Sequence, residues 1–293
     1  MGADRAIRSL AGLHLGDCFG ERFFVRGPEA VTLGLIADRA LPAPPWGWTD
    51  DTAQAHVLTD HLLEFGEVRQ DELAVALARR FWSDPARGYG AGARDLLGAI
   101  AIGDDWRTVA RASFGGMGSM GNGAAMRVPP LGAYFSEDLG RAAIEAARSA
   151  EVTHANVNGV AGAVAVAVAT ACFARGDPDE AVWHEVLQRT PESHTRDCVA
   201  AAAALPLDVE IAAAARVLGT GSRVCAYDTV PFCIWLALAA RQRSFEDAMW
   251  RTVEGLGDRD TTCAIVGGIL AAADHVELPD EWVASLEPLQ AGG

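Results

Sequence analysis

Apolar residues recur at helical spacing along much of the chain. They stand three or four positions apart through residues 57–65, 73–81 and 265–270, a period that places them on one face of an α-helix. Alanine-rich stretches at 197–204 and 209–217 favour helices by intrinsic propensity. Runs of β-branched residues bounded by hairpin turns are missing. The pattern therefore predicts an all-α protein with almost no sheet.

Glycine and proline separate these helical segments in short clusters. The clusters occupy residues 42–48, 87–92, 114–123 and 129–132, as expected of loops between helices. No long linker, shift in composition or fixed-period repeat accompanies them, which argues against a second domain and against a solenoid. We therefore expect the 293 residues to fold as one compact domain, 1–293.

Residues 157–174 form the apolar stretch that is long enough to raise the question of a membrane span. The stretch consists of Ala, Val and Gly with little Leu, Ile or Phe. Such weakly apolar side chains favour a helix packed at the centre of a soluble protein. We expect no membrane partner.

Charge and cysteine content narrow the function classes further. The 24 basic residues, all arginine, stand against 39 acidic ones, and the formal net charge is -15. A phosphate backbone or an anionic membrane would be repelled, so no nucleic acid binding through a basic patch is expected. The six cysteines include no C-x-x-C pair, which indicates buried thiols in a reducing cytoplasm. The lack of lysine and the abundance of Ala and Arg suggest a bacterial genome rich in G and C.

Two acidic clusters stand directly before helical patterns. The first contains Thr49, Asp50 and Asp51, and the second contains Asp258 to Thr261. Asp and Thr commonly cap helix N-termini, because their oxygens accept the free backbone N–H groups. A cap needs only one side chain, whereas each cluster offers two carboxylates and at least one hydroxyl. If the clusters met, their charge would call for protons or cations, and oxygen ligands without His or Cys suit Mg²⁺ or Mn²⁺.

The chain resembles the ADP-ribosylglycohydrolase family in a series of motifs that follow the family's order. The first, Gly12 to Gly20, is similar to the family's opening G-x-x-x-G-D-x-x-G. The others are Trp48-Thr49-Asp50-Asp51-Thr52, Arg87 to Gly92, Gly118 to Arg127, Thr153-His154-Ala155, Asp228 to Phe232, and Gly257-Asp258-Arg259-Asp260-Thr261. Together they span nearly the whole chain.

The resemblance implies an all-α fold with a two-metal site at the floor of an ADP-ribose cleft, and a hydrolase that cleaves ADP-ribose from a modified protein or small molecule. Two Mg²⁺ or Mn²⁺ ions are implied as cofactors. The implied metal ligands are Thr49, Asp50, Asp51, Asp258, Asp260 and Thr261. Among the aspartates, Asp51 more than Asp50 is expected to orient the attacking water. The implied substrate contacts are Gly88, Gly90, Ser119, Met120, Gly121, Asn122, Gly123 and His154.

Several of these positions allow a second interpretation. Residues 116–121 satisfy G-x-G-x-x-G, but the segment before them is too short and polar for a strand and prolines follow soon after, which argues against a dinucleotide-binding βαβ unit. Asp228 is expected to cap a helix over 230–239. His154 serves either as a structural residue or as a ligand contact. Three aromatic residues, Trp46, Trp48 and Tyr89, either pack or stack on an adenine.

The chain departs from the family at two positions. Phe24 stands where many members carry a glutamate on a segment that covers the scissile bond, and Glu21 or Glu29 could take over that role. We therefore include Glu21 among the catalytic candidates. Arg259 lies between two presumed ligands where a small hydroxyl residue is usual. These departures motivate an alternative, a catalytically silent ADP-ribose-binding protein, and more weakly a structural protein that has kept only the fold.

Overall fold

The computed structural model describes residues 1–24 and 29–289, and within these ranges the chain is helical with no strand. The predicted all-α class is confirmed. In order, the helices are α1 (Gly2–Glu21), α2 (Glu29–Ala37), α3 (Asp50–Phe65), α4 (Gln70–Ser83), α5 (Ala91–Ala101), α6 (Trp106–Gly116), α7 (Gly123–Met126), α8 (Pro129–Tyr134), α9 (Leu139–Glu151), α10 (Val157–Arg175), α11 (Asp179–Arg189), α12 (His194–Ala203), α13 (Ile211–Leu218), α14 (Ala226–Ala239), α15 (Phe245–Glu254), α16 (Arg259–Ala271) and α17 (Asp280–Val283).

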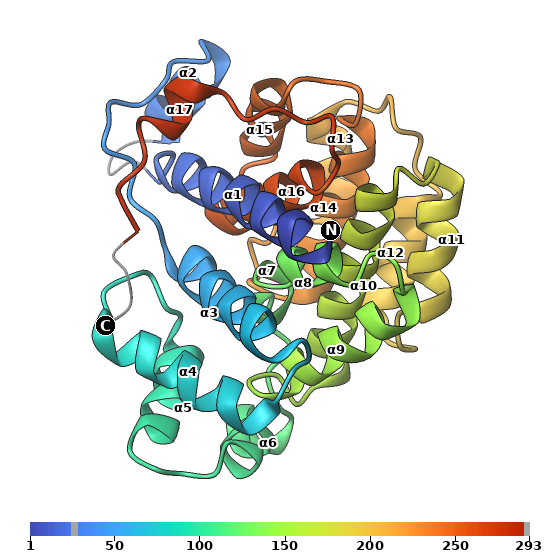
Figure 1. The fold of residues 1–293 in the computed structure, drawn as a ribbon. Coiled ribbons are helices and arrows are strands. Elements are labelled where there is room, and N and C mark those ends of the chain that lie inside the picture. The colour runs from blue at the N-terminus through green and yellow to red at the C-terminus, as the bar shows by residue number, and fades with distance from the viewer. Residues whose placement is uncertain (25–28, 290–293) are drawn as a thin grey trace.

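Helix α10 lies at the centre of the fold, as the small apolar side chains of residues 157–174 predict. It packs against α7, α8, α9, α11, α12, α14 and α16 (Figure 1). The helix is long and apolar enough to cross a membrane by length and composition, but 83% of that apolar window is buried inside the protein. Alanine and glycine on all sides of α10 let the neighbouring helices approach closely without large voids.

Helices α1 and α16 pack against each other more extensively than any other pair within the described ranges (Figure 1). Gly12, Gly16 and Gly20 recur every four residues and so lie on one face of α1. A Cβ atom at Gly16 would overlap the backbone carbonyl of Cys263, and one at Gly20 would overlap that of Arg259. The glycine face therefore brings the two helix backbones into contact. This contact places the end of α1 beside the start of α16.

The C-terminal segment fixes the loop that leads into α3. The backbone N–H of Trp46 donates to the carbonyl of Ser285 (2.8 Å), and the N–H of Glu287 donates back to Trp46 (2.9 Å). The carboxylate of Glu287 accepts two hydrogen bonds from Arg87, each 2.8 Å long. The guanidinium of Arg87 in turn stacks on Trp48, 3.4 Å from the ring centroid. These contacts hold Trp46 and Trp48, which directly precede the acidic cluster at the start of α3.

Candidate metal centre and ligand cavity

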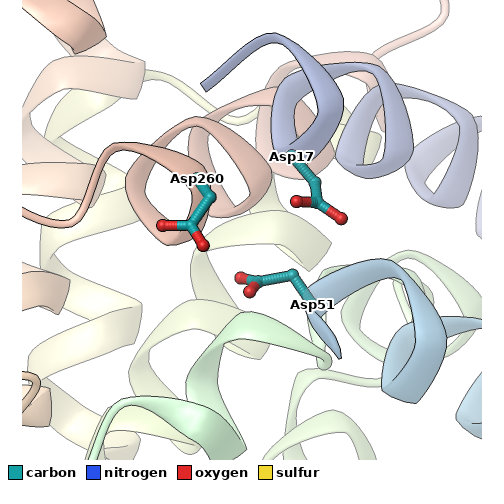
Figure 2. A group of neighbouring side chains, drawn as sticks. All are labelled: Asp17, Asp51 and Asp260. Carbon is teal, nitrogen blue, oxygen red and sulfur yellow. The ribbon is translucent and has the colours of Figure 1, made fainter. Parts of the chain in front are cut away.

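Three aspartates from helices distant in the sequence meet at one point (Figure 2). Asp17 belongs to α1, Asp51 to the first turn of α3 and Asp260 to the first turn of α16. One carboxylate oxygen from each aspartate lies within 4.8 Å of those of the other two. The helix starts near residues 50 and 260 therefore converge, and α1 adds a third carboxylate.

Asp17 is the functional candidate that the sequence analysis did not single out. Its carboxylate accepts hydrogen bonds from the backbone N–H groups of Thr49 (2.9 Å) and Thr52 (3.2 Å) and from both threonine hydroxyls. It therefore binds the N-terminus of α3, where such an anion is favoured. A signal was present in the sequence, because an aspartate between Leu15 and Phe19 on a buried helix face needs a partner.

The predicted metal ligand Thr49 has its hydroxyl engaged within the protein. Thr49 is the N-cap of α3, and its Oγ1 accepts the backbone N–H of Asp51 (3.3 Å). The same hydroxyl lies 2.7 Å from Asp17 and 3.1 Å from Asp51. The capping interpretation thus accounts for Thr49. By contrast, Asp258 occupies the N-cap position of α16 without making a capping bond, so its carboxylate remains available for other contacts.

Burial raises the pKa of every carboxyl group in the cluster. The pKa of Asp51 and that of Asp260 lie well above the ordinary value, first because the groups are desolvated and then because other carboxylates surround them. Desolvation also raises the pKa of Asp17, and the hydrogen bonds from Thr49 and Thr52 offset part of this effect. Such a cluster is stable at neutral pH only if it holds protons or a cation.

The donor set fits a divalent cation that prefers oxygen ligands. Oδ1 of Asp51 and Oδ1 of Asp260 are buried and have no hydrogen-bond partner within the described part of the chain. A bound cation would satisfy both atoms and offset the charge that burial disfavours. Carboxylate and hydroxyl oxygens are the ligands that Mg²⁺ and Mn²⁺ select.

Asp50 and Asp258 extend the carboxylate cluster toward the solvent. Burial raises the pKa of Asp50 to about 7, and a hydrogen bond from Gln54 (2.9 Å) partly opposes this shift. Asp258 accepts a hydrogen bond from the side-chain amide of Asn122 (2.7 Å). Oγ1 of Thr261 lies 3.5 Å from Oδ2 of Asp51. All the predicted ligand residues thus lie in or directly beside the cluster.

A cavity of about 530 Å³ opens above the carboxylates. Four of them, those of Asp50, Asp51, Asp258 and Asp260, line it together with Thr261. It also contains every residue that the sequence analysis proposed as a substrate contact: Gly88, Gly90, Ser119, Met120, Gly121, Asn122, Gly123 and His154. Leu96, Leu97, Phe114 and Met126 add an apolar wall. The cavity thus combines carboxylates, glycine-rich backbone and apolar side chains in its lining, as ligand sites commonly do.

His154 is fixed beneath the glycine-rich loop of residues 118–123. Its Nδ1 lies 2.7 Å from Oγ1 of Thr153, and its ring is close to Gly121 and Gly123. Burial lowers the pKa of His154 to about 3, so the imidazole is neutral at physiological pH. A neutral ring can stack on a ligand or exchange a hydrogen bond with it. The contact with Thr153 agrees with a structural role for His154, and its place in the cavity lining agrees with a role in ligand contact.

Three aromatic residues, for which the sequence allowed either packing or stacking on an adenine, pack in the protein interior. Trp46, Trp48 and Tyr89 are 1%, 3% and 2% exposed, and none of them lines the cavity. The packing interpretation therefore holds for all three.

The predicted helix cap at Asp228 is wrong. Helix α14 begins four residues earlier than expected, at Ala226, and its N-cap is Cys225. The carboxylate of Asp228 instead accepts the backbone N–H of Arg223 (2.8 Å) and closes the preceding loop. Pro231 consequently lies inside the helix. The sequence suggested a later start because a proline usually marks the first turn.

The two departures from the family pattern contact each other. The guanidinium of Arg259 lies 4.5 Å from the ring centroid of Phe24, and Arg259 does not line the cavity. Glu21 ends α1 and does not line it either, but proximity to Asp17 and Asp258 adds to the effect of burial in raising its pKa. Glu29 begins α2, and its side chain lies outside the described part of the structure.

The helical fold, the buried carboxylate cluster and the glycine-lined cavity together define an all-α protein in which the donor set of a cation site lies beside a small-molecule cavity. The sequence profile of the ADP-ribosylglycohydrolase family matches residues 2–292, and the chain belongs to this family.

Several similar proteins are ADP-ribosylhydrolases. The chain is 28% identical to ADP-ribosylhydrolase ARH3 of Bos taurus and 27% identical to that of Homo sapiens, each over 322 residues. The alignments cover 95% of this chain and 87% and 88% of the relatives. An Archaeoglobus fulgidus protein is 32% identical over 289 residues, 95% of this chain and 90% of its own length. The family and these relatives support an ADP-ribosyl hydrolase.

A solved structure shares the fold. It is described as an ADP-ribosylglycohydrolase-related protein complex, and it superposes with a TM-score of 0.66 at 23% identity. The match covers 98% of this chain and 93% of the other.

Proposed function

We propose that the chain is a metal-dependent hydrolase that cleaves the glycosidic bond between ADP-ribose and a modified protein side chain or small molecule. The observation that carries this proposal is the meeting of Asp17, Asp51 and Asp260, of which Asp51 and Asp260 also line the cavity. The carboxylates would contact the part of the ligand that carries the scissile bond. The glycine-rich loop would contact the rest of the ligand.

The carboxylates are proposed to hold two Mg²⁺ or Mn²⁺ ions. Thr261 and the aspartates Asp50, Asp51, Asp258 and Asp260 would be ligands, with Asp17 added from the structure and Thr49 acting through its hydrogen bonds. When bound, such ions polarise oxygens and lower the pKa of a coordinated water. Asp51, with Asp50 beside it, would orient the attacking water while positive charge develops on the sugar.

Glu21 is proposed as the carboxyl group that exchanges a proton with the leaving group. It lies one helical turn after Asp17 in α1, and partial desolvation together with the nearby Asp17 and Asp258 raises its pKa, which favours the protonated form that a general acid needs.

The glycine-rich loop is proposed to bind the diphosphate of ADP-ribose. Backbone N–H groups of glycine-rich segments form concave anion sites, and glycine allows close approach. Ser119 to Gly123 would make these contacts, with Gly88, Gly90 and His154 as further contacts from the cavity lining.

Release of ADP-ribose tests the proposed function directly. The purified protein would receive ADP-ribosylated arginine, ADP-ribosylated serine and O-acetyl-ADP-ribose, each with Mg²⁺, with Mn²⁺ and with EDTA. We expect metal-dependent release from at least one substrate. Glu21→Gln should lower that release while leaving Mn²⁺ affinity unchanged. No release from any substrate would contradict the hydrolase.

The same preparation distinguishes the alternative of a silent ADP-ribose-binding protein, which Phe24 in place of the usual glutamate favours. Calorimetric binding of ADP-ribose without turnover would support that alternative. Absence of binding would rule it out.

Metal should stabilise the protein more strongly as the pH rises. A carboxyl group whose pKa is raised in the folded state destabilises the metal-free protein at a pH above its unfolded value of about 4, and the cost is complete above the folded pKa. Because the pKa of Asp50 is about 7, part of this loss of stability occurs near neutral pH. Mn²⁺ offsets the cost by binding the charged forms. The melting temperature gained with Mn²⁺ over EDTA should therefore grow from about pH 5 to about pH 8. A gain that is constant over this range would contradict the assignment.

A further inference from the structure

The charged side chains that line the ligand cavity are mostly acidic. Four carboxylates, from α3 and the start of α16, line it. Arg223 is the one arginine among the described residues that line the cavity, and its loop packs beside Asp258, because the N–H of Asp258 donates to the carbonyl of Thr220 (3.0 Å). The protein as a whole carries a formal charge of -15 and repels anions at long range. An anionic ligand therefore meets one local positive charge inside the cavity, and Arg223 supplies it.

The loop that carries Arg223 is held through its backbone. The N–H of Arg223 donates to Asp228 (2.8 Å), and the N–H of Gly221 donates to the Asp228 carbonyl (2.8 Å). The N–H of Val224 closes the turn onto the carbonyl of Gly221 (2.6 Å). Within the described part of the chain, the guanidinium of Arg223 takes part in no hydrogen bond or ion pair. The side chain is exposed and available to a ligand, while the loop itself does not depend on it.

The Arg223 loop pairs with the glycine-rich loop of residues 118–123. The N–H of Asn122 donates to the carbonyl of Val224 (3.3 Å), and the N–H of Ala226 donates to that of Met120 (3.0 Å). These bonds hold the two loops side by side, and residues of both loops line the cavity. Arg223 therefore stands next to the backbone to which we assign the diphosphate.

The backbone conformation of Val224 is a separate observation that points to a ligand site at this loop. Its φ of 54° lies in the left-handed region, which a β-branched residue rarely adopts. Its side chain is 57% exposed and also lines the cavity, so burial of the side chain does not explain the conformation. Strained residues of this kind persist at ligand sites, where the surrounding contacts hold them.

We propose that Arg223 binds the phosphate groups of the nucleotide ligand and sets the preference of the cavity for a diphosphate. The proposal rests on the proposed function, because ADP-ribose is the ligand that brings a diphosphate to the glycine-rich loop. The planar guanidinium can donate two parallel hydrogen bonds to phosphate oxygens. The loop amides and the neighbouring Arg223 would then hold the diphosphate together, leaving the distal ribose to reach the carboxylate centre.

Binding of ADP-ribose, ADP and adenosine to Arg223→Ala tests this role. Charge-assisted hydrogen bonds at a partly exposed site predict about tenfold weaker binding of ADP-ribose and of ADP at low ionic strength. Adenosine, which has no phosphate, should bind as it does to the unchanged protein. The loss should shrink in high salt, which screens exposed charges. Equal weakening of all three ligands would overturn the proposal, as would unchanged binding of ADP-ribose.

Two further variants separate charge from changes in the fold. Arg216 is exposed on α13 and does not line the cavity, so Arg216→Ala makes the same change in net charge and should bind all three ligands normally. Arg223→Lys keeps the charge and should bind ADP-ribose more tightly than Arg223→Ala; equal binding by the two variants would contradict the assigned role. If the unchanged protein fails to bind ADP-ribose, the proposed function fails as well. If it binds and only the Arg223 effect is missing, the proposed function stands.

Discussion

Replacing Asp51 by asparagine should remove the hydrolase activity, with release of ADP-ribose falling at least about a thousandfold. Asp51 is 1% exposed, and its carboxylate lies within the three-aspartate cluster. Loss of a metal ligand weakens the charge stabilisation that a bound cation supplies, an effect of several kcal/mol, and each 1.4 kcal/mol corresponds to about a factor of ten in rate.

The same variant should be more stable than the unchanged protein when both are free of metal. Burial raises the pKa of Asp51 well above its ordinary value, so the neutral amide removes an unfavourable charge. Opposite signs for activity and stability distinguish a functional carboxylate from a structural one. Thermal melting in EDTA and metal titration would measure both changes.

Asp60→Asn in the same helix is the matched control for Asp51. Asp60 is exposed and pairs with His56 (3.0 Å), a surface pair that contributes little. Its replacement should leave both activity and melting unchanged. If Asp51→Asn also kept its turnover, Asp51 would not be a metal ligand.

Gly16→Ala should destabilise the protein by about 3 kcal/mol or more. A Cβ atom at this position would overlap the backbone carbonyl of Cys263, and a helix backbone cannot rotate aside as a side chain can. Overpacking of this kind commonly costs about 1–3 kcal/mol, and rigid neighbours place the cost at the upper end. Separation of α1 from α16 would also move Asp17 away from Asp260, so metal affinity should fall together with the free energy of unfolding.

The same substitution at Gly98 provides the comparison. Gly98 lies within α5, and a Cβ atom there would be 4.0 Å from the ring of Phe81, an ordinary contact. Alanine should therefore be neutral or stabilise the helix by up to about 1 kcal/mol. Chemical denaturation measures both variants. Equal effects at the two positions would show that close packing of α1 on α16 is not what Gly16 provides.

The helices were predictable because their signals are local. The period of apolar residues and the weak side chains of residues 157–174 indicate both helix formation and central burial, and α10 (Val157–Arg175) lies where they place it. The start of α14 was not predictable in the same way. Asp228 and Pro231 look like the beginning of a helix, but backbone contacts with the glycine-rich loop extend the helix to Ala226.

The carboxylate centre was only half predictable from the residues themselves. The surplus of acidic groups before α3 and α16 pointed to cations, but nothing local shows that two helix starts some two hundred residues apart converge. That information lies in the packing of α1 against α16 through Gly12, Gly16 and Gly20. Asp17 was missed for the same reason, since its partners Thr49 and Thr52 lie on another helix.

Anomalous X-ray diffraction from crystals soaked with Mn²⁺ and ADP-ribose tests the central claim most directly. The account predicts manganese peaks between the carboxylates of Asp17, Asp51 and Asp260, with the distal ribose beside them and the diphosphate against residues 118–123. Manganese bound elsewhere, or ADP-ribose bound with no metal peak among these three carboxylates, would contradict it.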